Sequence, residues 1–174
     1  MHIIAITGLA RSGKDTAAKY ISEKYGFVWF DFSRDVLAGE LKKHELPLTK
    51  ENMSAAGDKL RKKYGQDALA QRLVEKIKES GAKSVIISGV RSPEEAIYLK
   101  SNSEIFMLIN LVADANKRIK RSGNADIERR DEQDIKNKGL AKVLEMADIT
   151  IENNSTVNEL YKKIDDAITR QALF

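Results

Sequence analysis

The chain has 174 residues, 42% hydrophobic and 32% charged, so it is long enough for one domain with a sizeable core. It has no cysteine and only two histidines, which excludes disulfides, thiolate metal sites and a cysteine nucleophile and argues against a Ser-His-Asp triad. The net charge of +4 comes from interspersed acidic and basic residues, a pattern that favours a site for anionic small molecules over a dedicated nucleic-acid surface. Without a membrane-length apolar stretch or a signal peptide, we expect a cytoplasmic protein with no membrane contact.

Apolar runs and turn residues predict an alternation of strands and helices along the chain. Short β-branched runs predict strands at residues 2–7, 27–31, 83–88, 104–111 and 147–152. Helices are expected at 14–25, at 33–80 with breaks near Pro47 and Gly65, after the Ser92 cap with Pro93 at its first position, at 114–146 with a break at 122–124, and after a Ser155 or Thr156 cap. This order predicts one domain over residues 1–174, a three-layer α/β sandwich with a five-stranded parallel sheet.

The stretch "GLARSGKDT", residues 8–16, follows the first expected strand and opens the first expected helix. Glycines at this spacing let the backbone amides of residues 11–16 point inward as an anion nest, and the helix N-terminus adds partial positive charge. The lysine then reaches the terminal phosphates of a nucleotide. We therefore expect a phosphate loop (P-loop) that binds ATP through Gly8, Arg11, Ser12, Gly13, Lys14, Asp15 and Thr16.

The residue after the loop lysine is Asp15, where GTPases and most ATPases carry a hydroxyl that ligates Mg²⁺. Here the hydroxyl comes one position later, at Thr16. The resulting "GKDT" resembles the "GKGT" loop of adenylate kinases and the loop of deoxynucleoside monophosphate kinases. This resemblance implies a small-molecule kinase whose Mg²⁺ is held largely by phosphates and water, with Thr16, and Asp15 through water, as the metal-placing residues. Arg11 stands where those kinases usually carry a glycine.

Two arginines are candidates for holding the phosphoryl acceptor. The segment "ISGVRSPEEA", residues 87–96, is similar to an adenylate kinase segment in which an arginine after the third strand grips the acceptor phosphate. The resemblance gives this role to Arg91, whose planar guanidinium can bind two phosphate oxygens. The alternative is a surface arginine before a helix cap. Ser88 replaces the acidic residue of the family segment, and Arg61 is the second acceptor candidate.

The ends of the second and fifth strands carry further candidates. Asp31 lies at the carboxyl end of its strand, where ligands of doubly wound sheets gather. It resembles the aspartate of dephospho-CoA kinases, which implies that it orients the acceptor hydroxyl or takes its proton; the alternative is a cap for the helix near Ser33. "ADITIENNST", residues 147–156, resembles the dephospho-CoA kinase ending and implies that Asn153 and Asn154 lie near the adenine, with a plain turn as the alternative.

The basic stretch "NKRIKRSGNADIERRDEQD", residues 116–134, resembles the lid of nucleotide kinases. Arg118 and Arg121 lie one helical turn apart, and Arg129 and Arg130 follow the "SGN" break. The resemblance implies that arginines here close over the transferring phosphoryl group, with Arg118 or Arg121 clamping the transition state. The alternative is a solvated helix face.

Together these segments resemble P-loop nucleotide kinases, in particular archaeal adenylate-kinase-related and dephospho-CoA-kinase-like proteins, over most of the chain. The resemblance implies a nucleoside monophosphate kinase-like fold with acceptor-binding helices at about 33–80 and a lid at about 116–134. It also implies ATP- and Mg²⁺-dependent phosphoryl transfer to a nucleoside or deoxynucleoside monophosphate, or to dephospho-CoA. The alternative, supported by Ser88 and Arg11, is a nucleotide-binding regulatory or RNA-associated protein with only slow ATP hydrolysis.

Overall fold

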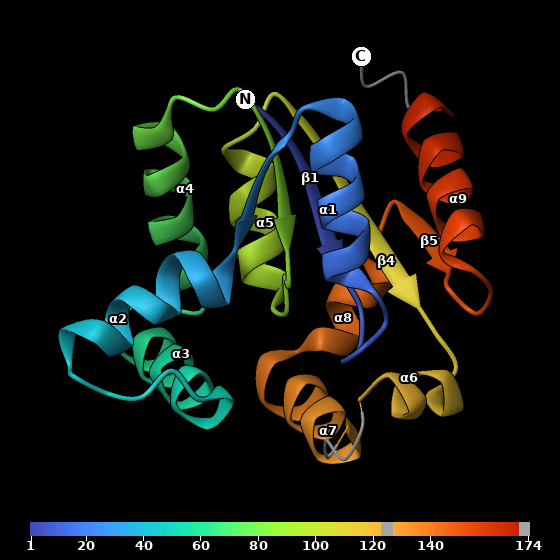
Figure 1. The fold of residues 1–174 in the computed structure, drawn as a ribbon. Helices are drawn as coiled ribbons and strands as arrows, with labels where there is room; N and C mark the ends of the chain where they lie inside the picture. Colours follow the sequence, from blue (N-terminus) through green and yellow to red (C-terminus); the bar gives the residue numbers. More distant parts are fainter. Residues whose placement is uncertain (123–126, 171–174) are drawn as a thin grey trace.

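The computed structural model describes residues 1–122 and 127–170, which form strands that alternate with helices (Figure 1). In chain order the elements are β1 (His2–Thr7), α1 (Lys14–Tyr25), β2 (Val28–Asp31), the π-helix η1 (Phe32–Leu37), α2 (Ala38–Lys43), α3 (Lys50–Tyr64), α4 (Ala68–Ser80), β3 (Ser84–Ser88), α5 (Pro93–Ser101), β4 (Ile105–Val112), α6 (Ala115–Ser122), α7 (Ile127–Lys138), α8 (Leu140–Glu145), β5 (Ile149–Glu152) and α9 (Val157–Arg170).

The described strands form one parallel sheet in the order β2-β3-β1-β4-β5. β1 is the central strand, and its Ile4 lies opposite Ile86 of β3 and Met107 of β4. A wholly parallel sheet needs cover on both faces and is built from continuous apolar runs, as these strands are. The predicted three-layer α/β sandwich with five parallel strands is therefore confirmed.

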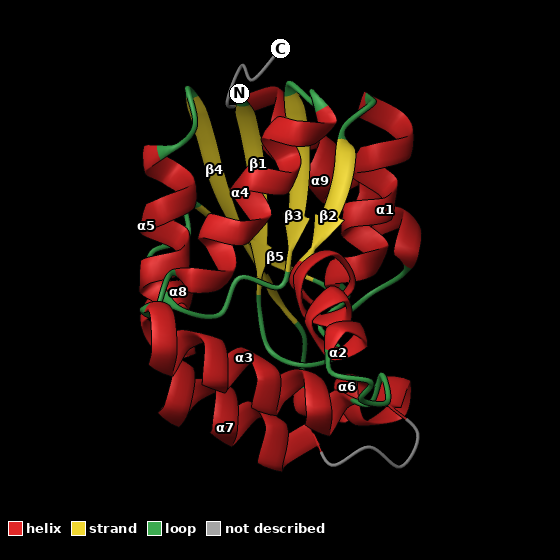
Figure 2. Cartoon of the chain, turned by 90° about the vertical axis from the view of Figure 1, so that its left-hand side faces the viewer, coloured by secondary structure: helices red, strands yellow, loops and turns green. Residues whose placement is uncertain are grey.

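Alternate residues of β1 point to opposite faces of the sheet and enter two separate apolar cores. Ile3 and Ala5 pack in the core that includes side chains of η1, α3, α4, α5 and α8. Ile4 and Ile6 pack in the core formed with α1 and α9. Figure 2 shows α4 and α5 on one side of the sheet and α1 and α9 on the other. Each fully buried isoleucine contributes about 1.5–3 kcal/mol to this packing.

Most helix boundaries follow the expected signals. The Ser92 hydroxyl accepts a hydrogen bond from the Glu95 backbone N–H at 3.1 Å, and the Glu95 carboxylate accepts one from the Ser92 N–H at 3.2 Å, a capping box with Pro93 in the first helical position. The expected helical region 114–146 has a second break, at Gly139 with φ 75°, which we did not predict. Most of the expected break at 122–124 lies outside the described residues.

The remaining helices stand beyond the carboxyl ends of the strands. In Figure 1 the strands point toward α2 and α3 on one side and α6 and α7 on the other. In an open parallel sheet this edge, outside the carboxyl ends, is where ligands bind. None of the described helices is long and apolar enough to span a membrane.

Candidate active site

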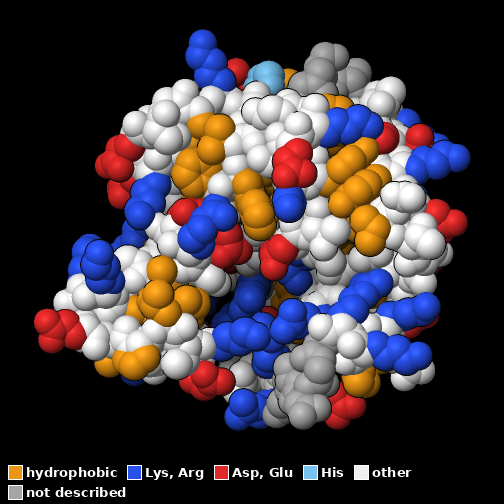
Figure 3. All heavy atoms as spheres, in the orientation of Figure 1, with side chains coloured by type: hydrophobic (Ala, Val, Ile, Leu, Met, Phe, Trp, Pro, Cys, Tyr) orange, Lys and Arg blue, Asp and Glu red, His pale blue; other side chains and the backbone are white. Residues whose placement is uncertain are grey.

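A cleft of about 1200 Å³ opens at the carboxyl edge of the sheet, between the phosphate loop, the ends of β2 and β3, η1, α3 and α7. Lysine and arginine side chains gather in this hollow, as the lower half of Figure 3 shows. Pockets for one small molecule usually measure about 300–1,000 Å³. The cleft is therefore large enough for a nucleotide together with a second ligand.

The phosphate loop is built on three left-handed backbone positions. Gly8 has φ 139° and Gly13 has φ 106°, and a Cβ atom at Gly8 would lie only 2.3 Å from the carbonyl oxygen of Leu111. Arg11 has φ 62°, so it adopts the glycine-like conformation although it carries a side chain. Such a conformation costs about 1–2 kcal/mol in a non-glycine residue, so the surrounding contacts must enforce it.

A buried ion pair between α6 and α7 fixes the apex of the loop. The Ala10 N–H donates to Asp131 Oδ1 at 3.0 Å, and Arg118 Nη1 donates to the Ala10 carbonyl oxygen at 3.1 Å. Arg118 Nη1 also donates to Asp131 Oδ2 at 2.5 Å, and both side chains are largely buried. Arg118 does not line the cleft, because its guanidinium is used in holding the loop.

A second set of contacts holds the middle of the loop. Asn153 Nδ2 donates to the Ser12 carbonyl oxygen at 2.8 Å, and a Cβ atom at Gly13 would lie 2.3 Å from the same amide nitrogen. Arg121 lines the cleft and donates to the carbonyl oxygens of Asn153, at 2.9 Å, and Arg11, at 3.4 Å. Asn153 thus supports the loop, while its contact with an adenine remains a prediction.

Asn154 is bonded to the start of α6. Its side chain accepts a hydrogen bond from the Asp114 N–H at 2.8 Å and donates to Asp114 Oδ1 at 2.9 Å. The turn after β5 is thereby tied to the turn after β4. Its predicted proximity to an adenine is likewise untested.

Lys14 presents its ammonium group at the mouth of the loop. Its Nζ donates to the carbonyl oxygens of Gly8, at 2.9 Å, and Leu9, at 2.8 Å. Burial, together with the nearby Arg91 guanidinium, lowers the pKa of Lys14 to about 8 against the opposing effect of Asp15. A cation held in an unfavourable, partly desolvated position is prepared to bind an anion, which relieves that cost.

Asp15 and Thr16 lie in the first turn of α1, are exposed, and line the cleft. No group of three or more His, Cys, Asp or Glu residues that could hold a metal ion occurs among residues 1–122 and 127–170. The oxygens of these two side chains, with Asp31 on the same cleft, are ligands of the type that Mg²⁺ prefers. They fit a Mg²⁺ ion bound mainly through substrate phosphates and water rather than in an all-protein cage.

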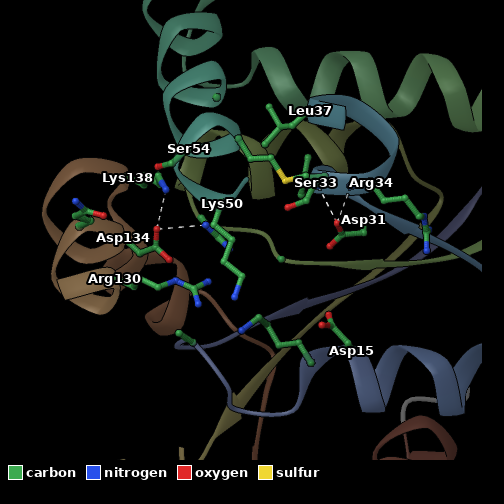
Figure 4. Close-up of a pocket in the computed structure, with 18 of the residues that line it drawn as sticks. Asp15, Asp31, Ser33, Arg34, Leu37, Lys50, Ser54, Arg130, Asp134 and Lys138 are labelled. Atoms are coloured by element: carbon green, nitrogen blue, oxygen red, sulfur yellow. Dashed lines mark hydrogen bonds and ion pairs between the residues drawn. The ribbon is translucent and has the colours of Figure 1, made fainter. Parts of the chain in front are cut away.

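Asp31 caps η1 and also faces the cleft (Figure 4). Its Oδ1 accepts hydrogen bonds from the backbone N–H groups of Ser33, at 2.8 Å, and Arg34, at 3.0 Å. Its Oδ2 accepts from the Ser88 hydroxyl at 3.1 Å, and Ser88 in turn accepts from Trp29 Nε1 at 3.0 Å. Asp31 therefore caps the helix, as the alternative interpretation predicted. Its Oδ2 also places a carboxylate next to Ser88, the position at which the adenylate kinase segment has its acidic residue.

The two acceptor candidates have different surroundings. Arg61 is 8% exposed and donates to Glu95 Oε1 at 2.6 Å, and Glu95, which is fully buried, also accepts from the Arg91 N–H at 3.0 Å. The Arg61–Glu95 pair therefore braces the turn that carries Arg91. The Arg91 guanidinium lies on the cleft, 3.4 Å from Asp134 Oδ1.

Lys50, Asp134 and Lys138 also line the cleft but were not among the candidates from sequence, and Arg130 was named only as one arginine of the basic stretch 116–134 (Figure 4). Lys138 Nζ donates to Asp134 Oδ1 at 2.8 Å. Burial opposes ionisation of Asp134, but Arg91 and Lys138 outweigh it and lower the pKa of this carboxyl. Arg130, Asp134 and Lys138 follow one another at the helical i, i+4 spacing, and Lys50 follows the Thr49 cap of α3. The sequence gives no more specific signal for these four residues.

The chain is similar to several known proteins. A family model described as "AAA domain" matches residues 4–148. A UPF0200 protein of Methanoregula boonei is 33% identical, with 97% of this chain and 96% of that protein aligned, and one of Thermococcus kodakarensis is 31% identical, with 97% and 99% aligned.

Solved structures with the same fold include two shikimate kinases. That of Acinetobacter baumannii, in complex with shikimate, has a TM-score of 0.63 at 17% identity and covers 100% of this chain and 96% of that one. That of Aquifex aeolicus has a TM-score of 0.61 at 22% identity and covers 98% of each chain. The sequence matches and the shared fold agree with the expected superfamily. The chain belongs to the "AAA domain" family, together with the UPF0200 proteins, and has the P-loop kinase-like fold of these shikimate kinases.

Proposed function

We propose that this protein transfers a phosphoryl group from ATP to a nucleotide-like acceptor, a nucleoside or deoxynucleoside monophosphate or dephospho-CoA. The observation that carries the proposal is the position of Lys14 beside Arg91 at the cleft between α3 and α7. Lys14 would face the donor phosphates and Arg91 the phosphate of the acceptor, one on each side of the transferring group. In phosphoryl transfer such positioning and charge neutralisation supply most of the catalysis.

In this proposal, the donor and the acceptor occupy opposite ends of the cleft. The amides of the phosphate loop and Lys14 bind the ATP phosphates, and Asp31 Oδ2 orients the attacking oxygen of the acceptor. Arg121, which lines the cleft, takes the clamping role in preference to the buried Arg118. Helices of the region 33–80 form the acceptor side, and residues 116–134 form the lid, within one domain over residues 1–174.

Thr16 and Asp15 would help to hold Mg²⁺, which when bound neutralises charge on the β- and γ-phosphates. Both side chains lie in the first turn of α1, next to the loop amides.

The acceptor side of the cleft has an apolar wall that suits a nucleotide base. The wall is lined by the side chains of Phe32, Leu37, Met53 and Leu69. Ser33, Ser54 and Asp58 add hydrogen-bonding groups at its edges. A predominantly apolar pocket with a few polar groups is the usual environment for a ring system bound by a protein. This wall supports a nucleotide-like acceptor.

A panel of acceptors with γ-labelled ATP tests the proposal. The panel contains the common ribo- and deoxyribonucleoside monophosphates, dephospho-CoA and the matching nucleosides, each with Mg²⁺. We expect label transfer to at least one nucleotide, and loss of that transfer in Lys14→Met. Hydrolysis of ATP at a rate that no acceptor changes would refute the kinase.

That last outcome would favour the second candidate function, a nucleotide-binding regulatory or RNA-associated protein with slow hydrolysis. Ser88 is the observation in its favour, since β3 ends in a hydroxyl rather than a carboxylate. The carboxylate of Asp31, 3.1 Å from the Ser88 hydroxyl, weighs on the side of the kinase.

A further inference from the structure

Two groups of cations in or beside the cleft differ in their partners. In the first group each arginine makes an ion pair with a carboxylate: Arg34 with Asp35, Arg61 with Glu95, Arg91 with Asp134, and Arg118 with Asp131. A paired arginine has most of its charge compensated by the protein itself. For the buried Arg61 and Arg118 the main contribution is to position a turn or the phosphate loop, whereas Arg91 also lines the cleft.

The second group consists of Arg11, Lys50 and Arg130. Within the described part of the chain, none of their side chains makes a hydrogen bond or an ion pair, although Arg130 is half-buried. They come from three elements: the apex of the phosphate loop, the first residue of α3, and the first turns of α7. In Figure 4 the side chains of Lys50 and Arg130 extend into the same space of the cleft.

Arg11 and Arg130 are close enough to Lys50, and Arg11 is close enough to Arg130, to disfavour the charge of these neighbours. Arg130 is the largest cause that lowers the pKa of Lys50, with burial and Arg11 adding to it. Burial lowers the pKa of Arg130, and Arg91 and Arg11 lower it further, against Asp134 and Asp131. Convergence of unpaired cations from separate elements is unfavourable unless an anion binds between them.

We propose that Arg11, Lys50 and Arg130 form a second anion site beside the phosphate loop, and that its ligand is the phosphate group carried by the acceptor itself. The identity of the occupant rests on the proposed function; the anion site does not. The acceptor class is then a phosphate monoester, which favours the nucleoside and deoxynucleoside monophosphates over dephospho-CoA, whose diphosphate is esterified at both ends. Neutral hydroxyl compounds without a phosphate are excluded as good substrates. Lys50 also adds the N-terminal end of α3, a 15-residue helix, to the binding of this phosphate.

The neighbours of Arg130 explain why the acceptor, rather than the donor, supplies the anion. Lys14, which belongs to the phosphate loop, marks the donor side, whereas Lys50 lies near Arg130 and Arg11. Arg130 lies near both lysines, because it also lowers the pKa of Lys14. Arg91 in turn lowers the pKa of Arg130. A cation between two phosphates offsets their repulsion as they approach for transfer.

The test is equilibrium binding of inorganic phosphate to the full chain whose phosphate loop is saturated with a non-hydrolysable ATP analogue and Mg²⁺. We expect wild-type protein to bind phosphate under these conditions, and Lys50→Ala and Arg130→Ala each to weaken it about tenfold or more, the loss expected for one charge-assisted contact. Lys59→Ala, on an exposed part of α3, and Lys136→Ala, on an exposed part of α7, are the matched controls and should bind as wild type.

Three results would overturn the proposal. One is no phosphate binding once the analogue is bound, and another is unchanged phosphate binding in both cleft variants. The third is weaker binding of the ATP analogue with phosphate affinity retained, which would assign the three cations to the γ-phosphate of the donor.

The outcome is separable from that of the proposed function, because phosphate binding requires no transfer. If the acceptor panel shows no transfer but the cleft variants lose phosphate, the anion site stands and the kinase falls. If transfer occurs and the KM of the active acceptor is the same in wild type, Lys50→Ala and Arg130→Ala, the kinase stands and the anion site falls. Transfer to a nucleoside as efficient as transfer to its monophosphate would also overturn the acceptor assignment.

Discussion

Arg118 and Asp131 together bind both backbone polar groups of Ala10, so an ion pair between α6 and α7 fixes the apex of the phosphate loop. The two side chains are 13 residues apart in sequence, and residues 123–126 between them are outside the described part of the chain. The pair gives the loop its shape without a nucleotide. It also connects that shape to the positions of α6 and α7.

Removal of one partner of this pair should destabilise the protein strongly. Asp131→Asn leaves the Arg118 charge buried without compensation, and breaking a buried ion pair in this way costs about 3–5 kcal/mol. Urea denaturation measures the loss. Glu132→Gln, which breaks an exposed pair with Lys136 on the same helix, is the control and should change the free energy of unfolding by less than about 0.5 kcal/mol. Equal effects of the two variants would show that the buried pair has no special role.

Replacement of the loop lysine should stabilise the protein while removing nucleotide binding. Burial lowers the pKa of Lys14 to about 8, so at pH 7 the folded protein carries the cost of a desolvated charge. Lys14→Met removes that charge and keeps the length of the side chain, which should raise the free energy of unfolding by about 1–3 kcal/mol. Thermal unfolding and titration with ATP measure the two effects. Lys19→Met, on the exposed side of α1, should leave both unchanged. A destabilised Lys14→Met would contradict this account of the lysine.

The same lysine predicts a pH dependence of stability. Its pKa in the folded state is about 8, below the ordinary 10.5, so between these values the unfolded state binds more protons than the folded state. Stability from this group therefore rises as the pH increases from about 8 to about 10.5. The difference in unfolding free energy between Lys14→Met and wild type should shrink over this window. A difference that stays constant with pH would refute the assignment.

Nucleotide binding should be linked to proton uptake in the same window. An anion beside Lys14 favours its charged form and raises its pKa, so complexes formed near pH 9 take up a proton. Calorimetry in buffers with different ionisation enthalpies measures this uptake. It should be absent in Lys14→Met if residual binding is detectable.

Asp31 allows its structural and chemical roles to be separated by one substitution. Asparagine caps a helix about as well as aspartate, so Asp31→Asn should keep the free energy of unfolding within about 0.5 kcal/mol. Without a carboxylate at Oδ2, phosphoryl transfer should fall about 10²-fold, the lower range for a lost acid-base group. Asp31→Ala should lose about 1 kcal/mol of stability as well. Wild-type transfer rates in Asp31→Asn would leave Asp31 as a cap alone.

The fold follows from local signals that a single sequence carries. The β-branched runs, the glycines after α1 and α4, and the Ser92–Pro93 start of α5 each act within a few residues, and the structure has the corresponding elements. Position in the sheet is different, because β1 pairs with β3 and β4 through contacts about 80 and 100 residues away in sequence. The alternation of strands and helices predicts a parallel sheet but does not specify that order.

The site was predictable where a motif fixes the backbone, and not where partners are distant. The spacing of Gly8, Gly13 and Lys14 determines the loop, and these residues line the cleft. By contrast, a run of charges does not show which arginine faces a carboxylate. Arg118 meets Asp131 and is buried, whereas Arg130, from the same basic stretch, faces the cleft. Only the packing of α6 and α7 on the loop decides between them.

The two apolar cores have a consequence for how this molecule opens in solution. Neither core cluster contains a residue of α6 or α7 from the described part of the chain, and although Ile127 of α7 is buried, hydrogen bonds and an ion pair connect these two helices to the phosphate loop. They can therefore undock in a sub-global opening that leaves the sheet intact. Native-state hydrogen exchange should be slowest in β1, which is bonded on both sides, and much faster in α6 and α7. A ligand that contacts both α3 and α7 should slow hydrogen exchange in α6 and α7 but not in the sheet, because it holds these two helices in their docked position.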